Sequence, residues 1–231
     1  MNLKVAETYD VPLIIDGEPA AAADGKTMAI VNPANGRAIG QLAAASAADV
    51  DRAVQAAHRA FESGVWRDLS VHQRARVLNR FADLFEAEIE QFYQLETLNN
   101  GRPVNETRAQ ISRLPQFYRY FAALALTRRS DVIPVEGPYL VYTQRVPLGV
   151  CALMTSFNHP LMILSKSLAP ALATGNSVVI KPSEQTPITT LRLVQLLHEA
   201  GVPKGVVNLI NGEGREAGAV DQVHHALGHA G

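Results

Sequence analysis

Polar and glycine-rich clusters follow three apolar segments in the carboxyl-terminal half of this 231-residue chain. They are Thr-Ser-Phe-Asn at 155–158, Lys-Pro-Ser-Glu at 181–184 and Asn-Gly-Glu-Gly at 211–214. The preceding segments PLGVCALM, SVVIK and GVVNLI are short and rich in β-branched residues, which is typical of buried parallel strands. Ligands of an open α/β sheet bind at the carboxyl ends of its strands, so the clusters predict one binding edge.

For each of the three clusters, the residues alone allow an interpretation without a ligand. Lys181 and Glu184 lie where a ribose would bind, but a solvated charged loop is the simpler interpretation. Gly212, Gly214 and Gly218 form GxGxxxG after the third strand rather than the first, so a plain turn is equally compatible. Asn158 precedes a helical segment and would serve as its N-cap.

Cys151, the only cysteine, lies inside the apolar strand GVCALM. A small buried hydrophobic role is expected there, and we assign it no catalysis. A single cysteine excludes an internal disulfide framework and fits a reducing compartment. His225 and His229 are four residues apart without acidic or cysteine partners, so we expect no metal site.

The spacing of apolar residues predicts the helices and strands that position these clusters. HPLMILSKSLAPALATG and TTLRLVQLLHEAG have helical length and spacing and connect the three strands. Strand–helix–strand alternation predicts an α/β fold with a parallel sheet. Asp-Gly in LIIDGEPA and Asn-Gly in NPANGRA predict two amino-terminal hairpins. Ser46 and Ser70 are expected to cap two helices, the second running to a stop at Asn100-Gly101.

A further helix is expected from Asn105 or Thr107, with Pro115 kinking or dividing it. Its aromatic residues indicate core packing rather than a stacking surface, because no basic stripe accompanies them. They are Phe117, Tyr118, Tyr120 and Phe121. Residues 131–147 predict extended segments in which YLVYTQRV alternates inward apolar and outward polar residues. Pairing with another subunit and a local hairpin are equally compatible with this arm.

Charge and hydropathy exclude several classes of partner. The formal net charge of −1 does not support nucleic-acid binding through a basic patch. No apolar run approaches the length of a membrane span, and MNLKVAETYD lacks a signal-peptide core. We therefore expect a cytoplasmic protein with neither a nucleic-acid nor a membrane partner.

Taken together and in order, several motifs resemble the amino-terminal half of the aldehyde dehydrogenase superfamily. They are NPANGRAIG, LETLNNGRP, TSFNHP, GNSVVIKPSEQTP and GVPKGVVNLINGEG. The resemblance implies oxidation of an aldehyde to a carboxylic acid with NAD(P)⁺ by a homo-oligomer. It implies an incomplete Rossmann-like doubly wound parallel sheet with amino-terminal β-hairpins and helices. The implied division is coenzyme-domain hairpins and helices at 1–130, an oligomerisation arm at 131–146 and the incomplete NAD-binding unit at 147–231, with the catalytic domain absent.

The resemblance also implies roles for single residues. Asn158 would donate its amide to the oxyanion formed when a cysteine thiolate attacks the aldehyde. Lys181 and Glu184 would bind the adenosine ribose, and the Glu184 carboxylate would repel a 2′-phosphate, so we expect NAD rather than NADP. The other implied cofactor contacts are Thr155, Ser156, Phe157, Ser183, Gly214 and Gly218. Ser-Phe replaces the family's common Pro-Trp before Asn158, which leaves substrate preference open.

The family's nucleophilic cysteine and general base lie beyond the glycine turn and have no counterpart in AVDQVHHALGHAG. We expect a truncated or frameshifted chain that is inactive alone. The alternative is a non-catalytic cofactor-binding or interaction protein that pairs with full-length relatives.

Overall fold

The computed structural model describes residues 8–215 and 217. Its central sheet has five strands in the order β3-β2-β10-β9-β8. The strands are β2 (Leu13–Ile15), β3 (Glu18–Ala20), β8 (Val150–Met154), β9 (Ser177–Lys181) and β10 (Val207–Leu209). β8, β9 and β10 are parallel, and β2 joins β10 antiparallel. The predicted parallel unit is therefore extended by the first hairpin of the chain.

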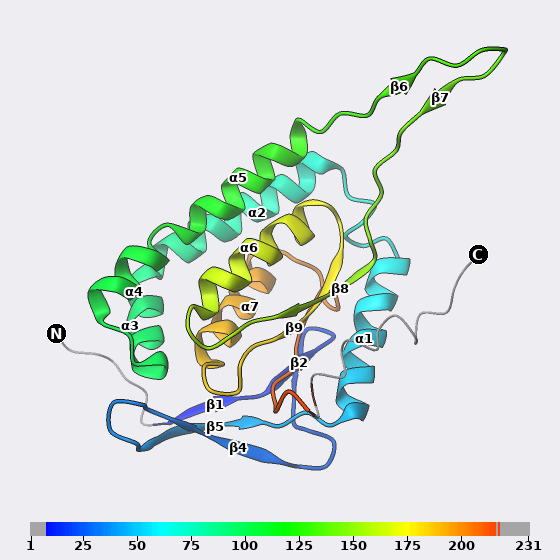
Figure 1. The fold of residues 1–231 in the computed structure, drawn as a ribbon. Coiled ribbons are helices and arrows are strands. Elements are labelled where there is room, and N and C mark those ends of the chain that lie inside the picture. The colour runs from blue at the N-terminus through cyan, green and yellow to red at the C-terminus, as the bar shows by residue number, and fades with distance from the viewer. Residues whose placement is uncertain (1–7, 216, 218–231) are drawn as a thin grey trace.

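Helices cover both faces of this sheet (Figure 1). α6 (Pro160–Ala173) connects β8 to β9 and α7 (Ile188–Ala200) connects β9 to β10, as the alternation predicted. Both pack in one apolar cluster with Val178 and Val207. On the other face, α1 (Ala47–Glu62) packs in a cluster with Val179. Alternate residues of the strands thus bury opposite faces, which a doubly wound sheet requires.

β8 differs from the prediction of a buried strand. All five residues of β9 are buried, whereas Met154 in β8 is 50% exposed. β8 is the outer strand of the sheet within the described residues, and its free edge and outer face account for the exposure.

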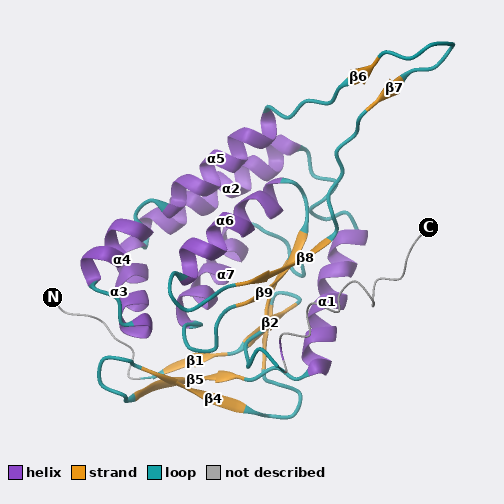
Figure 2. Ribbon diagram, viewed as in Figure 1, coloured by secondary structure: helices purple, strands orange, loops and turns teal. Residues whose placement is uncertain are grey.

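Both predicted hairpins are present. β2 and β3 are joined by Asp16 and Gly17, whose φ angles of 57° and 76° suit a two-residue turn that twists with its strands. A separate sheet in the order β1-β5-β4 contains the second hairpin (Figure 2). Its strands are β1 (Tyr9–Val11), β4 (Thr27–Val31) and β5 (Ala38–Ala43).

Capping boxes begin the first two helices, as predicted at Ser46 and Ser70. The helical region predicted from Ser70 to Asn100 is present, but it is divided at Glu88 into α2 (Val71–Ala87) and α3 (Ile89–Asn100). The sequence hides the break because the apolar spacing continues across it. α3 ends at Gly101 with a φ of 82°, as the Asn-Gly pair predicted.

Pro115 divides the next helical region. α4 (Val104–Ile111) precedes α5 (Leu114–Leu126), with Pro115 in the first turn of α5, where its missing N–H costs nothing. Tyr118 is buried edge-on to Phe81 at 4.6 Å between ring centroids. The core prediction is wrong for Tyr120, which is 61% exposed.

The arm at 131–146 is a hairpin that projects from the body of the molecule (Figure 1). β6 (Val132–Ile133) pairs antiparallel with β7 (Val141–Tyr142). The local hairpin is confirmed, but the alternation of inward and outward side chains is wrong because every residue from 131 to 146 is exposed.

Candidate functional site

The strands β8, β9 and β10 end side by side. The Thr155 N–H donates to the carbonyl of Lys181 at 3.1 Å, and the Ile210 N–H donates to the carbonyl of Ile180 at 2.9 Å. The three polar clusters therefore meet at one edge of the sheet. Gly218, His225 and His229 lie outside the described residues.

Lys181 is a buried cation at this edge. Its side chain is 8% exposed, Nζ donates to the carbonyl of Pro182 at 3.1 Å, and Glu184 Oε2 lies 3.9 Å away. The solvated-loop interpretation is therefore wrong for Lys181. Burial lowers the pKa of its ammonium, and the Glu184 carboxylate opposes that shift. Ser183, half-buried between them in sequence, accepts from the Gln185 N–H at 3.3 Å.

Threonine hydroxyls at the same edge have unused hydrogen-bonding capacity. The Oγ1 atoms of Thr155, Thr186 and Thr190 are buried without a partner among the described residues. These hydroxyls can therefore still donate to or accept from a further polar group. A cavity of about 540 Å³ opens nearby, and its lining includes Phe157, Glu184 and Thr186.

The two described glycines of this turn differ in the space around them. Gly212 has a φ of 136°, and a Cβ there would lie 3.2 Å from the backbone nitrogen of Ala45. A Cβ on Gly214 would meet nothing within 4 Å, and Gly214 is exposed. Packing within the described chain therefore requires Gly212 but leaves open space beside Gly214.

Asn158 is exposed in the loop after β8, next to exposed Ser156. Its Oδ1 accepts from Ser156 Oγ at 2.5 Å, which leaves the amide hydrogens for another acceptor. The helix-cap alternative is wrong, because the N-cap of α6 is His159.

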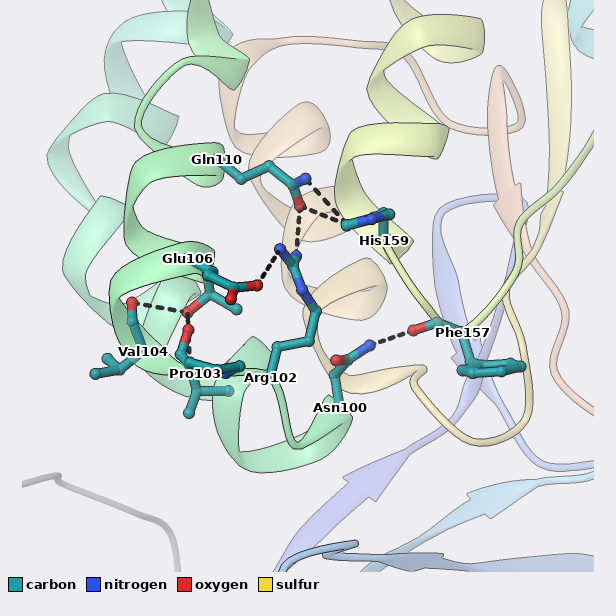
Figure 3. Close-up of polar contacts among 10 residues, drawn as sticks. Asn100, Arg102, Pro103, Val104, Glu106, Gln110, Phe157 and His159 are labelled. Carbon is teal, nitrogen blue, oxygen red and sulfur yellow. Dashed lines mark hydrogen bonds and ion pairs between the residues drawn. The ribbon is translucent and has the colours of Figure 1, made fainter.

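The last two residues of α3 hold both loops of the site, and Figure 3 shows the contact of Asn100 with the loop after β8. Asn100 Nδ2 donates to the carbonyl of Phe157. Asn99 Nδ2 donates to the carbonyl of Gln185 at 2.9 Å, and Asn99 Oδ1 accepts from the Ile188 N–H at 3.3 Å. Sequence reasoning treated Asn100 only as a helix stop, although two adjacent asparagines before a glycine were the available signal.

A relay of side chains fixes His159 (Figure 3). Arg102 Nη1 donates to Gln110 Oε1 at 2.8 Å, and Gln110 Nε2 lies 3.0 Å from His159 Nδ1. Gln110 Oε1 also lies 3.3 Å from His159 Nδ1, so Nδ1 accepts from Nε2 in one tautomer and donates to Oε1 in the other. Burial, with the charge of Arg102 as a smaller cause, lowers the pKa of His159. The lowered pKa favours the neutral imidazole over the imidazolium.

Glu96 is a buried carboxylate behind this loop. It is 1% exposed, and Oε2 accepts from the Leu161 N–H in the first turn of α6 at 3.4 Å. Oε1 has no partner among the described residues. Burial raises the pKa of Glu96 to about 7, although the Leu161 hydrogen bond and Arg102 oppose the shift.

The sequence is similar to that of known aldehyde dehydrogenases. The model of the aldehyde dehydrogenase family matches residues 20–226. This chain belongs to the aldehyde dehydrogenase family. It is 42% identical to mitochondrial aldehyde dehydrogenase of Equus caballus, covering 94% of this chain and 44% of that one. The chain thus spans less than half the length of the curated relatives it matches.

Solved aldehyde dehydrogenases share the fold. An NAD-dependent aldehyde dehydrogenase from Sinorhizobium meliloti matches with a TM-score of 0.90 at 34% identity, covering 95% of this chain and 44% of that one. Betaine aldehyde dehydrogenase from Staphylococcus aureus, solved in complex with NAD⁺, has a TM-score of 0.88 at 37% identity, covering 94% and 42%. The predicted family and the incomplete Rossmann-like fold are confirmed.

Cys151 does not resemble the activated thiolate of an aldehyde dehydrogenase. It lies in the edge strand β8, half-buried rather than fully buried as expected, and packs against the main apolar cluster. Burial raises the pKa of its thiol, which disfavours the reactive thiolate. Among the described residues, no group of three His, Cys, Asp or Glu side chains is placed to hold a metal ion, and no helix is long and apolar enough to span a membrane.

Proposed function

We propose that this chain is the cofactor-binding portion of an NAD-dependent aldehyde dehydrogenase, which oxidises an aldehyde to a carboxylic acid. One observation carries the proposal. Buried Lys181 is the last residue of β9, and Glu184 lies in the loop that follows it. Asn158, whose amide N–H₂ is left to donate, lies in the loop after the adjacent parallel strand β8. NAD⁺-bound relatives of the same fold support the choice of cofactor.

The residues fit a dinucleotide. Lys181 and Glu184 supply a donor and an acceptor for ribose hydroxyls. Thr155 offers a buried hydroxyl that lacks a partner among the described residues, and Gly214 leaves space for close approach. Ser156, Phe157, Ser183 and Gly218 complete the proposed contacts. When bound, the nicotinamide supplies the acceptor for the hydride of the substrate. The Glu184 carboxylate disfavours a 2′-phosphate, so NAD is preferred over NADP.

Asn158 is the proposed oxyanion donor. Ser156 Oγ donates to its Oδ1, so the amide N–H₂ is left to donate to an oxyanion. A preorganised donor of this kind contributes about 3 kcal/mol to transition-state stabilisation. Asn100 holds the neighbouring carbonyl of Phe157, which keeps the loop from shifting.

The covalent chemistry needs groups that these 231 residues do not provide. Their one cysteine, Cys151, has a raised pKa and lies in a strand of the sheet. We therefore propose that the chain alone does not oxidise aldehydes. NAD-dependent turnover by the purified chain, abolished by Cys151→Ala, would overturn this.

Assembly and domain division remain predictions. The arm at 131–146 exposes Tyr139 and Leu140 at 73% and 75%, which suits pairing with a second subunit of a homo-oligomer. The flanking parts are then the hairpins and helices up to 130 and the NAD-binding unit from 147. A cytoplasmic location also stays a prediction.

A second candidate is a non-catalytic cofactor-binding protein. The inactive environment of Cys151 and the continuous core shared by α2, α5, α6 and α7 favour it. Cooperative thermal unfolding with retained NAD binding would support this candidate, while aggregation of the purified chain would contradict it.

Calorimetric titration of the chain with NAD⁺ and NADP⁺ tests the proposal. We expect Lys181→Met to weaken NAD⁺ binding about ten-fold and Glu184→Gln to narrow the preference for NAD⁺ over NADP⁺. Lys166→Met removes an exposed lysine from α6 and serves as the matched control. A folded chain that binds neither nucleotide contradicts the proposal.

A further inference from the structure

A second cavity, of about 340 Å³, lies at the opposite ends of β8 and β9 from the proposed NAD site. Pro147, shortly before β8, and Ala173 and Thr174, shortly before β9, contribute to its lining. The remaining lining comes from Arg67 in the segment before α2, from α2 itself, from the end of α5 and from the base of the arm. Five arginines line the cavity, and none of its lining residues is Asp or Glu. They are Arg67, Arg74, Arg128, Arg129 and Arg145.

Arg74 is the buried charge of this cavity, with 8% of the residue exposed. Its Nε donates to the carbonyl of Ala173 at 3.3 Å, and Nη1 donates to the carbonyls of Arg67, at 3.0 Å, and Leu69. These partners are neutral, and no carboxylate of the described residues forms an ion pair with Arg74. Burial and the charge of Arg128 lower its pKa. A buried guanidinium beside a like charge is costly unless an anion joins it.

The other arginines leave the cavity positive. Asp68 matches the charge of Arg67, with 2.9 Å between Nε and Oδ1. Arg128, Arg129 and Arg145 are exposed and form no ion pair within the part of the chain that the structure describes. Arg128 and Arg129 follow α5 at the start of the arm, and Arg145 lies at its end. Guanidinium groups from both ends of the arm therefore face one space.

The end of α6 opposes an anion only weakly. Helix carboxyl ends carry partial negative charge. Here Arg74 donates to Ala173, and the Asn176 side chain donates to the carbonyl of Ala171 at 3.1 Å. Thr174 Oγ1 donates to the carbonyl of Pro170 at 2.8 Å. The last carbonyls of the helix are thus already satisfied.

We propose that this cavity is a binding site for a small phosphate-bearing anion, either inorganic phosphate or a phosphomonoester. Guanidinium forks match phosphate oxygens in pairs, and the volume accommodates a phosphate with a short organic group. Arg128, Arg129 and Arg145 contact the ligand directly, and Arg74 contributes its buried charge from below. A bound anion would connect the arginines at the two ends of the arm with each other and with Arg74 of α2.

Phosphate binding to the purified 231-residue chain tests the site. Isothermal titration calorimetry compares the affinity for inorganic phosphate with the affinity for glycerol phosphate, a phosphomonoester. Chloride keeps the ionic strength constant in both titrations. The double variant Arg128→Gln, Arg145→Gln removes two exposed guanidiniums, and we expect it to weaken binding at least about ten-fold. The control Arg76→Gln, Arg80→Gln removes equal charge from exposed positions of α2 outside the cavity. We expect NAD⁺ binding to be unchanged in both variants.

Trypsin gives an independent readout on the unmodified chain. Bound phosphate should slow cleavage after Arg128, Arg129 and Arg145 but not after Arg37, which is exposed in the β4–β5 turn. Equal weakening in both double variants, or equal protection by chloride, shows a general charge effect and overturns the proposal. The same follows if the folded chain binds neither phosphate compound.

Discussion

The two ends of α6 each bury one charged side chain from another helix. At its amino end, Glu96 of α3 accepts from the Leu161 N–H. At its carboxyl end, Arg74 of α2 donates to the Ala173 carbonyl. Each charge has the sign that the helix dipole favours. The same helix therefore connects the proposed NAD site at one end of the sheet to the arginine-lined cavity at the other.

The two charges differ in how their burial is relieved. Burial favours the neutral, protonated form of Glu96, and its pKa is therefore raised to about 7. Arg74 retains its proton at any pH a protein survives. A buried carboxyl can thus become neutral by itself, whereas a buried guanidinium needs carbonyls and anions around it. At the arginine end, the cavity lining includes no carboxylate that could balance this charge.

The largest expected effect is at the arginine end. Arg74→Met keeps an apolar stem but leaves the carbonyls of Arg67, Leu69 and Ala173 without their donor. We expect a loss of about 3 kcal/mol in the free energy of unfolding, measured with urea. Arg76→Met, on the exposed side of the same helix, is the control and should change stability by less than about 0.5 kcal/mol. Equal stability of the two variants would show that Arg74 does not stabilise the end of α6.

Glu96→Gln tests the opposite end through pH. The folded-state pKa of about 7 lies above the unfolded value near 4.5, so the folded state binds the extra proton between these values. Stability of the unmodified chain therefore falls as pH rises through this window, by about 3 kcal/mol in total. Glu96→Gln should be the more stable protein at about pH 8 and gain nothing at about pH 5.

Urea unfolding of both proteins at the two pH values measures this difference. Glu62→Gln, an exposed change at the end of α1, is the control. A Glu96→Gln variant less stable at the higher pH would mean that the ionised carboxylate is favourable at the helix end.

A smaller effect is expected from Gln110→Glu, beside the NAD site. The new carboxylate would accept from both Arg102 and His159, which favours the protonated ring and raises the pKa of His159 by about one unit. In the unmodified chain the pKa of His159 is lowered by folding, so the free energy of unfolding falls as the pH drops below about 6.5. The Gln110→Glu variant should not show this loss of stability. Proton NMR titration measures the pKa, with His159→Gln for assignment and Gln116→Glu as an exposed control. If the pKa of His159 is the same in the Gln110→Glu variant, residue 110 does not contact the imidazole as described.

The smallest effect on the fold is expected from Gly214→Ala, because its Cβ meets nothing within 4 Å. Unfolding free energy should change by less than about 0.5 kcal/mol while NAD⁺ affinity falls. Gly212→Ala places a Cβ 3.2 Å from Ala45 at a φ of 136° and should destabilise the chain by about 1–3 kcal/mol. Unchanged NAD⁺ affinity in Gly214→Ala would remove this glycine from the proposed site.

Local signals predicted much of the fold. The Asp16-Gly17 hairpin, the capping boxes at Ser46 and Ser70, and the division at Pro115 all depend on residues close in sequence. The order of strands and helices also predicted correctly that the three polar clusters meet at one edge of the sheet, since parallel strands align their carboxyl ends.

Tertiary contacts account for what was missed. Apolar spacing cannot reveal the break at Glu88, which depends on how α2 and α3 pack on other elements. Glu96 and Arg74 look like ordinary helical charges, and their burial follows only from α6 packing beside them. The half-exposure of β8 depends on its place in the sheet, which its own residues do not specify.

The pairing of β2 with β10 has a consequence for synthesis. The Asp16 N–H donates to Asn208 Oδ1 at 2.9 Å, across 192 residues of sequence. A ribosome adding about 5–20 residues per second needs roughly 10–40 seconds to make that stretch. Until then β2 can pair only with β3, and Ile14 lacks Leu209, its partner in β10. The first hairpin of the chain therefore completes its strand pairing only after the last described strand has been made.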